Sequence, residues 1–267
     1  MFRGGPTMRP RVAVVAVLAL VTPALAGCAR PPAWGPPAHV VDLTHTLSPR
    51  FPYIPIHDLT FPIRVTPISD FSRDGVYANK WELTEHDGTH VDAPSHFAAN
   101  ARGLDELRAD ELIVPAVVID FRARAAADVD ATLGVAELAD WERAHGRIPA
   151  RAAVLLWTGW ESRAGSEDAF VNAGPDGAMH FPGFGAQAVA FLARERSVSG
   201  IGTDTLSIDP GSDTRFTAHR ALFAADRWAI ECLAHLGDVP PVGATLVVGA
   251  TKVEHASGGP ARVFAVW

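Results

Sequence analysis

Residues 86–96 read His86-Asp87-Gly88-Thr89-His90-Val91-Asp92-Ala93-Pro94-Ser95-His96. The stretch holds three histidines and two aspartates, and imidazoles and carboxylates are ligands for zinc and manganese. Gly88 and Pro94 argue against a helix, because glycine is conformationally permissive and proline lacks a backbone donor. His90 and Asp92 stand two positions apart, so on a strand their side chains share one face. The pattern predicts a strand that runs into a turn, with a metal site at the end of this β element.

Candidates for the remaining ligands lie far along the chain. His219 belongs to a short helix-like run, and Glu231 follows the apolar residues 228–230, which read as a buried strand. A carboxylate directly after a buried strand is costly unless a cation or hydrogen-bond donors satisfy it. A metal ion would satisfy Glu231. The alternatives are a surface histidine at position 219 and an ion pair of Glu231 with Arg220 or Arg227.

Residues 86–96 contain the motif His-x-Gly-Thr-His-x-Asp-x-Pro-x-His without a gap. Through this motif the chain resembles the metal-dependent cyclase family, which includes bacterial kynurenine formamidases and isatin hydrolases. The resemblance implies the swivelling β/β/α fold, an α/β class with a mixed sheet in a single domain, assembled as a homodimer or larger homo-oligomer. Shorter matches carry it from about residue 40 to the C-terminus, at residues 42–44, 158–160, 180–183, 202–209 and 257–263.

The resemblance also implies roles for single residues. His86, His90 and Asp92 are implied to bind a divalent metal ion, and His219 with Glu231 to complete a second metal position in members with two ions. One or two zinc or manganese ions per chain are therefore expected. The last histidine of the motif, His96, is implied to be the catalytic group that carries protons; a hydrogen bond to a ligand carboxylate is the alternative. Asp204 and Asp209 are expected to form turns and support the ligands.

The expected activity follows from this ligand set. A bound metal ion lowers the pKa of its water to about 7, so hydroxide can attack an amide carbonyl while His96 passes a proton to the leaving nitrogen. The hypothesis is a metal-dependent amidohydrolase that cleaves a carbon–nitrogen bond in a cyclic or aryl amide. Two alternatives stay open: an arylformamidase of tryptophan catabolism, and a non-catalytic lipoprotein that binds a metal or another ligand.

The residues that line the substrate-binding pocket are harder to predict from the sequence. In the formamidases a tryptophan follows the Asp-Leu-Thr segment, and Ile54 stands where that tryptophan would fall, which argues against formylkynurenine as the substrate. Phe51 or Tyr53 would supply an aromatic wall or would pack against the sheet. His180 would line the mouth of the site or cap a loop. A small aromatic or cyclic amide is the expected substrate.

The N-terminus has the features of an exported protein. Residues 1–27 combine basic residues, a short apolar run and small residues, which is typical of a signal peptide. The ending Leu25-Ala26-Gly27-Cys28 resembles a bacterial lipobox, so Cys28 is expected to carry a lipid and residues 28–39 to form a proline-rich tether. Cleavage of an ordinary signal peptide near Ala26 is the alternative. The hydrolase domain is predicted over residues 40–267, on the periplasmic side of a bacterial membrane.

The net negative charge of the chain argues against binding to nucleic acid and against a basic membrane-binding patch. The chain has 23 Lys and Arg against 30 Asp and Glu, and the signal segment removes three positive charges and no negative ones. The mature chain is therefore acidic, at 20 positive against 30 negative side chains. An acidic surface repels the phosphates of nucleic acid, and it offers no basic patch to a membrane. Membrane contact is expected only through the lipid at Cys28.

Apolar periodicity predicts a mixed sheet with helices packed on it. Two helices are expected, one with a stripe from Val135 to Trp141 that Gly146 ends, and one with a stripe from Phe184 to Leu192. Trp81, Trp157, Trp160 and Trp228 lie in apolar contexts and are expected in the core. Strands are expected over residues 40–43, 63–67, 81–84, 114–121, 153–157, 198–202, 244–248 and 262–266.

Overall fold

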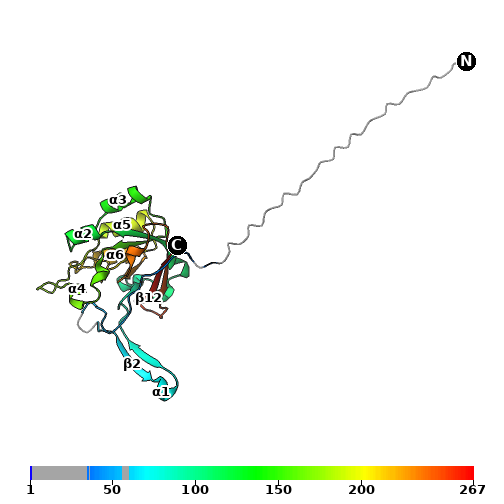
Figure 1. Ribbon diagram of the computed structural model, residues 1–267. Helices are drawn as coiled ribbons and strands as arrows, with labels where there is room; N and C mark the ends of the chain where they lie inside the picture. Colours follow the sequence, from blue (N-terminus) through cyan, green and yellow to red (C-terminus); the bar gives the residue numbers. More distant parts are fainter. Residues whose placement is uncertain (2–34, 36, 56–59) are drawn as a thin grey trace. The chain divides into compact units, whose positions relative to one another are not determined.

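The computed structural model describes Met1, Gly35, residues 37–55 and residues 60–267 (Figure 1). The expected signal segment, Cys28 and most of the expected tether lie outside these residues. Residues 37–267 form one structural unit. None of the helices in this described part has the length and the apolar character that a membrane span requires.

A large mixed sheet forms the centre of the molecule. Its four middle strands, β5, β7, β9 and β10, run parallel, and the remaining neighbours pair antiparallel. In sheet order the eight strands are β1 (Val40–Asp42), β12 (Gly258–Val266), β11 (Thr245–Ala250), β5 (Ile113–Asp120), β7 (Ala153–Trp157), β9 (Gly200–Thr203), β10 (Trp228–Glu231) and β4 (His90–Asp92).

The long strand β12 closes this sheet into a barrel-like ring. Its first residues, Gly258 to Pro260, pair with β4, and its later residues pair with β11 and β1. The two ends of the strand order are thereby joined through one strand. As a result β4, which carries the motif of residues 90–92, lies between β10 and β12.

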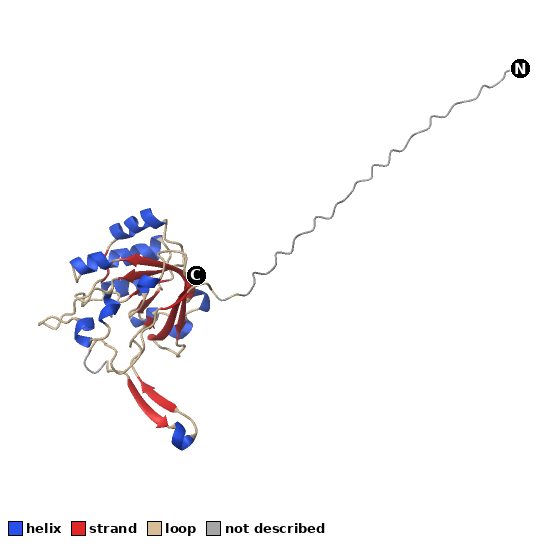
Figure 2. Ribbon diagram, in the orientation of Figure 1, coloured by secondary structure: helices blue, strands red, loops and turns tan. Residues whose placement is uncertain are grey.

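Two apolar cores lie on the two faces of the sheet, because alternate side chains of a strand point to opposite faces. On β5, Ala116 and Val118 belong to the core inside the ring, while Val117 and Ile119 belong to the core under the helices. In Figure 2 several of the helices lie together on one side of the central strands. The four central strands are therefore covered on both faces, as parallel strands usually are.

Helices α3 (Val135–His145) and α5 (Ala186–Glu195) overlap the two stretches predicted as helical, although Phe184, the first residue of the second stretch, lies before α5. Leu138 and Trp141 are the buried residues of α3, and the Trp141 indole donates to the carbonyl of Val118 at 3.0 Å. The other helices are α1 (Phe71–Asp74), α2 (Arg122–Ala127), α4 (Glu167–Val171) and α6 (Thr217–Phe223), with 3₁₀ turns η1 (Pro94–His96), η2 (Leu104–Glu106), η3 (Ala109–Glu111), η4 (Trp160–Arg163) and η5 (Leu236–Asp238).

Two small sheets complete the fold. Strands β6 (Thr132–Leu133) and β8 (Gly183–Phe184) pair in parallel. Strands β2 (Arg64–Ser69) and β3 (Ala78–Glu82) form a hairpin with α1 at its tip, and Figure 2 shows it pointing away from the sheet. We call residues 64–82 the hairpin arm.

The expectation that Trp81 lies in the core is wrong. Its side chain is 65 % exposed, because it lies on β3 opposite Val65 of β2 and both project from the two-stranded arm. The apolar context that suggested a core is a feature of this arm. By contrast, Trp160 and Trp228 are buried as expected, and Trp157 is partly buried.

Candidate metal centre

The motif of residues 86–96 forms a turn, the short strand β4 and the 3₁₀ turn η1. Gly88 has a φ of 65°, a conformation that glycine adopts without strain, and Pro94 begins η1. Strand β4 pairs antiparallel with β10, so that His90 lies opposite Glu231. The strand-into-turn prediction is confirmed, and pairing in the sheet brings together two residues that are far apart in the sequence.

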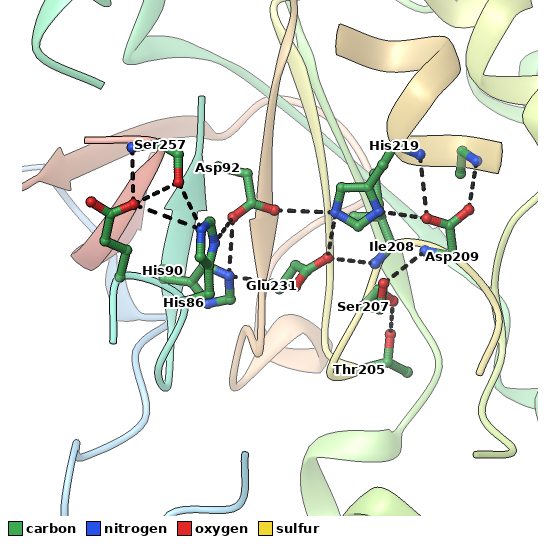
Figure 3. A network of polar contacts seen from close by, with 12 residues as sticks. His86, His90, Asp92, Thr205, Ser207, Ile208, Asp209, His219, Glu231 and Ser257 are labelled. Atoms are coloured by element: carbon green, nitrogen blue, oxygen red, sulfur yellow. Dashed lines mark hydrogen bonds and ion pairs between the residues drawn. The ribbon is translucent and has the colours of Figure 1, made fainter. Parts of the chain in front are cut away.

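The five candidate ligands form one cluster, in which three imidazoles surround the carboxylates of Asp92 and Glu231 (Figure 3). One Asp92 oxygen lies 2.6 Å from His86 Nδ1 and 3.1 Å from His90 Nε2, and its other oxygen lies 3.3 Å from His219 Nε2. Glu231 also divides its oxygens, with one 3.4 Å from His90 Nε2 and the other 3.1 Å from His219 Nε2. Helix α6 supplies His219 and strand β10 supplies Glu231. The structure thus brings all five residues together.

The cluster has an electrostatic need for a cation. Asp92 and Glu231 are buried, and the ion-pair partners recorded for them in the described part of the chain are histidines alone. Burial by itself would lower the pKa of His90, but the carboxylates of Asp92 and Glu231 outweigh it and raise that pKa well above its ordinary value. The same balance, with Asp209 contributing, raises the pKa of His219. Positive charge, from protons or from a metal ion, therefore stabilises this cluster.

The direction of the His90 ring favours a metal ion. His90 Nδ1 donates to the carbonyl of Gly88 at 2.8 Å, so the neutral ring turns the lone pair of Nε2 toward Asp92 and Glu231. Nε2 is buried and has no hydrogen-bond partner among the described residues. A lone pair that faces two carboxylates is repelled unless Nε2 takes up a proton or a metal ion lies between them. The residues present therefore fit a divalent ion.

Two sets of three donors satisfy the spacing of a metal site. In each set one ligand atom per residue lies within 4.8 Å of the others; the sets are His86, Asp92 and His96, and His90, Asp92 and Glu231. Asp92 belongs to both, so it is the carboxylate suited to bridge two ions. Imidazole and carboxylate donors suit zinc and manganese.

His96 lies beside this cluster, stacked on His86 with ring centroids 3.8 Å apart. Burial lowers the pKa of His96 to about 4, with the nearby His86 and His219 acting in the same direction against Asp92 and Glu231. It is therefore neutral at pH 7, more completely than a histidine with the ordinary pKa of about 6.5 would be. Its place in the first donor set also makes it a candidate ligand, so its proton role stays a prediction.

Asp209 positions His219 (Figure 3). One of its oxygens lies 2.5 Å from His219 Nδ1, and the other accepts from the backbone N–H of Ala218 at 2.5 Å. The resulting hydrogen bond directs His219 Nε2 at Asp92 and Glu231. Asp204 lies elsewhere and accepts from the backbone N–H and hydroxyl of Thr158, at 3.0 and 2.6 Å.

A second group that positions a candidate ligand lies beside His86, and the sequence did not predict it. Glu85 accepts from the backbone N–H and the hydroxyl of Ser257, at 2.9 and 2.6 Å, and Ser257 Oγ lies 3.1 Å from His86 Nε2. Ser257 precedes β12, which pairs with β4, so ring closure brings it here. Its only signal in the sequence was its place in a stretch that matches the family.

Three residues of the cluster, His86, His219 and Glu231, line a cavity of about 300 Å³, which we call the metal cavity. His90 and Asp92 do not line it but contact these three residues, and we call the five-residue cluster the floor of the cavity. Tyr53 and Ile54 line it, as do Phe97, Leu206 and Phe216, which the sequence reading did not include. Phe97 directly follows the motif and Phe216 lies three residues before His219, so an aromatic residue next to a ligand was the available signal.

Two other expected substrate residues do not line this cavity. Phe51 packs against His45 and Phe170, with ring centroids 5.2 and 5.9 Å apart. Nδ1 of His180 lies 2.9 Å from a carboxylate oxygen of Asp130, within hydrogen-bond distance. Both side chains thus have structural partners away from the floor of the cavity.

A family model described as a putative cyclase matches residues 41–210. The chain belongs to the putative cyclase family. Among its relatives, the isatin hydrolase of Roseibium aggregatum is 34 % identical over 85 % of this chain and 91 % of that protein. The kynurenine formamidase of Salinibacter ruber is 31 % identical over 67 % and 75 %, respectively. The solved structure of isatin hydrolase A from Ralstonia solanacearum, at 37 % identity, superposes with a TM-score of 0.81 and covers 85 % of this chain and 91 % of that one.

For this putative cyclase, the resemblance drawn from the motif and the α/β fold with its mixed sheet are thereby confirmed. The prediction of a hydrolase that acts on amide carbon–nitrogen bonds is confirmed at the level of class, because the relatives are enzymes of that kind. The donor sets agree with a divalent metal ion.

Proposed function

We propose that this chain hydrolyses a cyclic aryl amide, as its isatin hydrolase relatives do, with the help of one or two zinc or manganese ions. One observation carries the proposal: carboxylates and imidazoles from β4, α6 and β10 form one buried cluster, and His219 and Glu231 of this cluster line a cavity with largely apolar walls. The relatives named isatin hydrolase and their high coverage of this chain support the choice of substrate class.

The residues at and around the floor of the metal cavity would have three roles in hydrolysis, namely metal binding, positioning of the ligands and proton transfer. Asp92, Glu231 and the imidazoles around them would hold the ion or ions, and a bound divalent ion supplies Lewis acidity and an activated water. Asp209 fixes the ring of His219, and Ser257 contacts that of His86. His96 is neutral at pH 7, so one of its ring nitrogens accepts a proton before it can donate one to the leaving amine nitrogen.

The walls contribute binding and exclude water. Phe97 and Phe216 lie with ring centroids 5.1 Å apart, and Leu206 and Ile54 add aliphatic surface. A flat aromatic body is the shape that such walls bury best, because burial of apolar area supplies most of the binding free energy. The amide would then lie toward the polar floor.

A substrate panel tests the proposal. Protein loaded with zinc or with manganese is assayed on isatin, formanilide and N-formylkynurenine. Isatin should be hydrolysed with the highest kcat/KM. Turnover of formanilide but not of isatin would favour the second candidate, an arylformamidase, which the formamidase relatives support. Failure on all three amides with full metal occupancy would overturn the proposal.

A non-catalytic metal-binding protein is the rival from another class. Such a protein would close its metal with protein ligands alone, whereas an enzyme keeps a position open for water. The cavity that opens onto the donors supports the enzyme. A crystal structure with metal decides: an ion saturated by side chains would favour the binding protein.

Export and lipid anchoring are proposed from the sequence. The basic start, the apolar run and the Leu-Ala-Gly-Cys ending support a lipoprotein held by Cys28 on the periplasmic side of the membrane. Cells that express the chain are labelled with radioactive palmitate. Label should enter the wild type and Cys28→Ser should abolish it, while the matched Cys232→Ser keeps it. Equal labelling of Cys28→Ser and wild type would contradict the anchor.

A homodimer or larger homo-oligomer is proposed as well, supported by the apolar surface of the hairpin arm. Phe71, Tyr77 and Trp81 are 72 %, 68 % and 65 % exposed. A two-stranded hairpin is marginally stable alone, so a partner surface would stabilise it. Analytical ultracentrifugation should find an oligomer that Phe71→Ser with Trp81→Ser dissociates, while the control Val242→Ser, also at an exposed apolar position, does not. A monomeric wild type would contradict this proposal.

A further inference from the structure

A second cavity, of about 130 Å³, adjoins the metal cavity. Three residues line both cavities, namely Ile54, Ser207 and Phe216. Beyond them the second cavity is bounded by Met179 and Phe181, among others. We call it the side pocket. Because the same side chains face both spaces, a molecule that lies over the metal floor can extend past Ile54 and Phe216 into the side pocket.

The wall between the two cavities is held in a defined conformation. Phe216 has a φ of 54°, the left-handed region, which is unfavourable for a bulky side chain. The turn around Asp213 imposes it: Asp213 accepts from the backbone N–H of Arg215 at 2.9 Å and of Thr217 at 3.1 Å. Its carbonyl also accepts from the N–H of Phe216 at 3.3 Å. The ring of Phe216 is therefore kept at the boundary of the two cavities at a cost in backbone strain.

Size and charge define what the side pocket accepts. A dry cavity of about 150 Å³ lined by aliphatic and aromatic side chains binds one benzene ring, so 130 Å³ suits a single ring. Asp209 and Asp213 also line the pocket, and both carboxylates already accept hydrogen bonds from α6 or the turn before it. Their negative charges repel an anion. A neutral aromatic ring fits best.

We propose that the substrate is a two-lobed amide, with the amide over the metal floor and a second aromatic ring in the side pocket. The inference rests on the proposed function for the position of the amide. The orientation follows from charge: hydrolysis of the amide leaves a carboxylate, which Asp209 and Asp213 would repel from the side pocket. The second ring therefore lies on the part of the substrate remote from the scissile bond.

Binding of reaction products tests the side pocket without turnover. Calorimetry on the metal-loaded protein compares isatinate, the ring-opened acid from isatin, with isatinates that carry a phenyl group at ring position 5, 6 or 7 in turn. At least one phenyl derivative should bind roughly tenfold more tightly or better, as expected for burying an aromatic ring. Equal or weaker binding of all three derivatives by the wild type would overturn the proposal.

Variants of the side pocket test whether the gain in affinity from the phenyl group arises in that pocket. Met179 lines the side pocket but not the metal cavity, so Met179→Trp should fill the pocket and reduce the tenfold preference to about one, with the affinity for isatinate unchanged within about twofold. Met179→Leu is the matched control and should keep the preference. Thr214→Phe, on the exposed side of the same pocket, provides a second test if Met179→Trp does not fold. Retention of the preference in the folded blocking variants would also overturn the proposal.

The two proposals can fail separately. A protein that hydrolyses none of the amides but shows the preference, and loses it in Met179→Trp, would lose the proposed function and keep the side pocket. A protein that hydrolyses isatin and binds every isatinate alike would keep the proposed function and lose the side pocket.

Discussion

The floor and the walls of the metal cavity differ in how they are held. On the floor, Asp92 and Glu231 are each fixed by contacts with at least two imidazoles, and every ring has a defined direction. The walls are side chains such as Tyr53 and Ile54, which contribute area rather than directed bonds. A change on the floor should therefore abolish chemistry, whereas a change in the walls should alter selectivity and leave chemistry in place.

The largest effect is expected at the carboxylate that both donor sets share. Asp92→Asn removes the negative charge between His86, His90 and His219, so it should abolish metal binding and lower kcat/KM by at least roughly 10⁴-fold. Metal analysis and rates on isatin measure this. A variant with full metal content and a rate within tenfold of wild type would remove the distinction between floor and walls.

His96 should separate proton transfer from metal binding. His96→Asn is expected to lower kcat by about 10²–10⁴-fold with metal content unchanged, because it removes a group that accepts and donates protons. Its position in the first donor set offers the contrary outcome. If metal and activity are lost together, His96 belongs to the ligands.

Asp209 tests whether positioning a ligand matters as the geometry indicates. Asp209→Asn weakens the contact that directs His219, and metal affinity should fall by about 10–100-fold. Competition with a chelator measures the affinity. The matched control is Asp204→Asn, another buried aspartate that contacts Thr158 instead, and it should leave metal affinity unchanged. Equal losses in both variants would mean that burial, not positioning, explains the effect.

A wall residue should show a smaller effect of another kind. Tyr53→Ala is expected to raise KM for isatin about five- to tenfold while kcat stays within about threefold, since it removes binding area but no reacting group. Phe51→Ala is the control outside the cavity; it should lower the melting temperature, because it packs on Phe170, and leave KM unchanged. A fall in kcat for Tyr53→Ala would mean that Tyr53 contributes to the chemical step, as the floor residues do, and not only to substrate binding.

Asp204 should affect stability rather than activity. Burial raises the pKa of Asp204 to about 6, against the opposing hydrogen bonds from Thr158. The folded protein then binds a proton more tightly than the unfolded chain, so the contribution of Asp204 to the free energy of unfolding falls as pH rises from about 4 to 6. The loss is about 3 kcal/mol.

Asp204→Asn should remove this dependence. Denaturant unfolding at pH 4, 5, 6 and 7 would show the variant gaining stability relative to wild type as pH rises. Parallel curves for the two proteins would show that Asp204 titrates as it does in the unfolded chain.

The sequence predicted the floor far better than the walls. Residues 86–96 hold three of the floor residues within one strand and the turn before it, and the buried run before Glu231 marked a carboxylate that needs a cation. Those signals are local, and pairing of β4 with β10 then brings them together. Strand and helix positions were predictable for the same reason, since β5, β7, α3 and α5 carry clear periodicity.

The walls depend on where loops come to lie, which periodicity does not record. Phe97 and Phe216 reach the cavity from segments more than a hundred residues apart, while Phe51 and His180 find partners elsewhere. The prediction of a buried Trp81 was wrong for a related reason, because an apolar strand in a projecting hairpin has the same sequence pattern as a strand in a core. Tertiary position decided each of these cases.

Metal content of the wild-type protein, purified without added ions, tests the account most directly. Mass spectrometry of the metals should find one or two equivalents of zinc or manganese per chain. Chelation should remove both the metal and the hydrolysis of isatin, and either ion should restore activity. A protein that hydrolyses isatin at full rate with no bound divalent ion would contradict the assignment of these carboxylates and imidazoles to a metal centre.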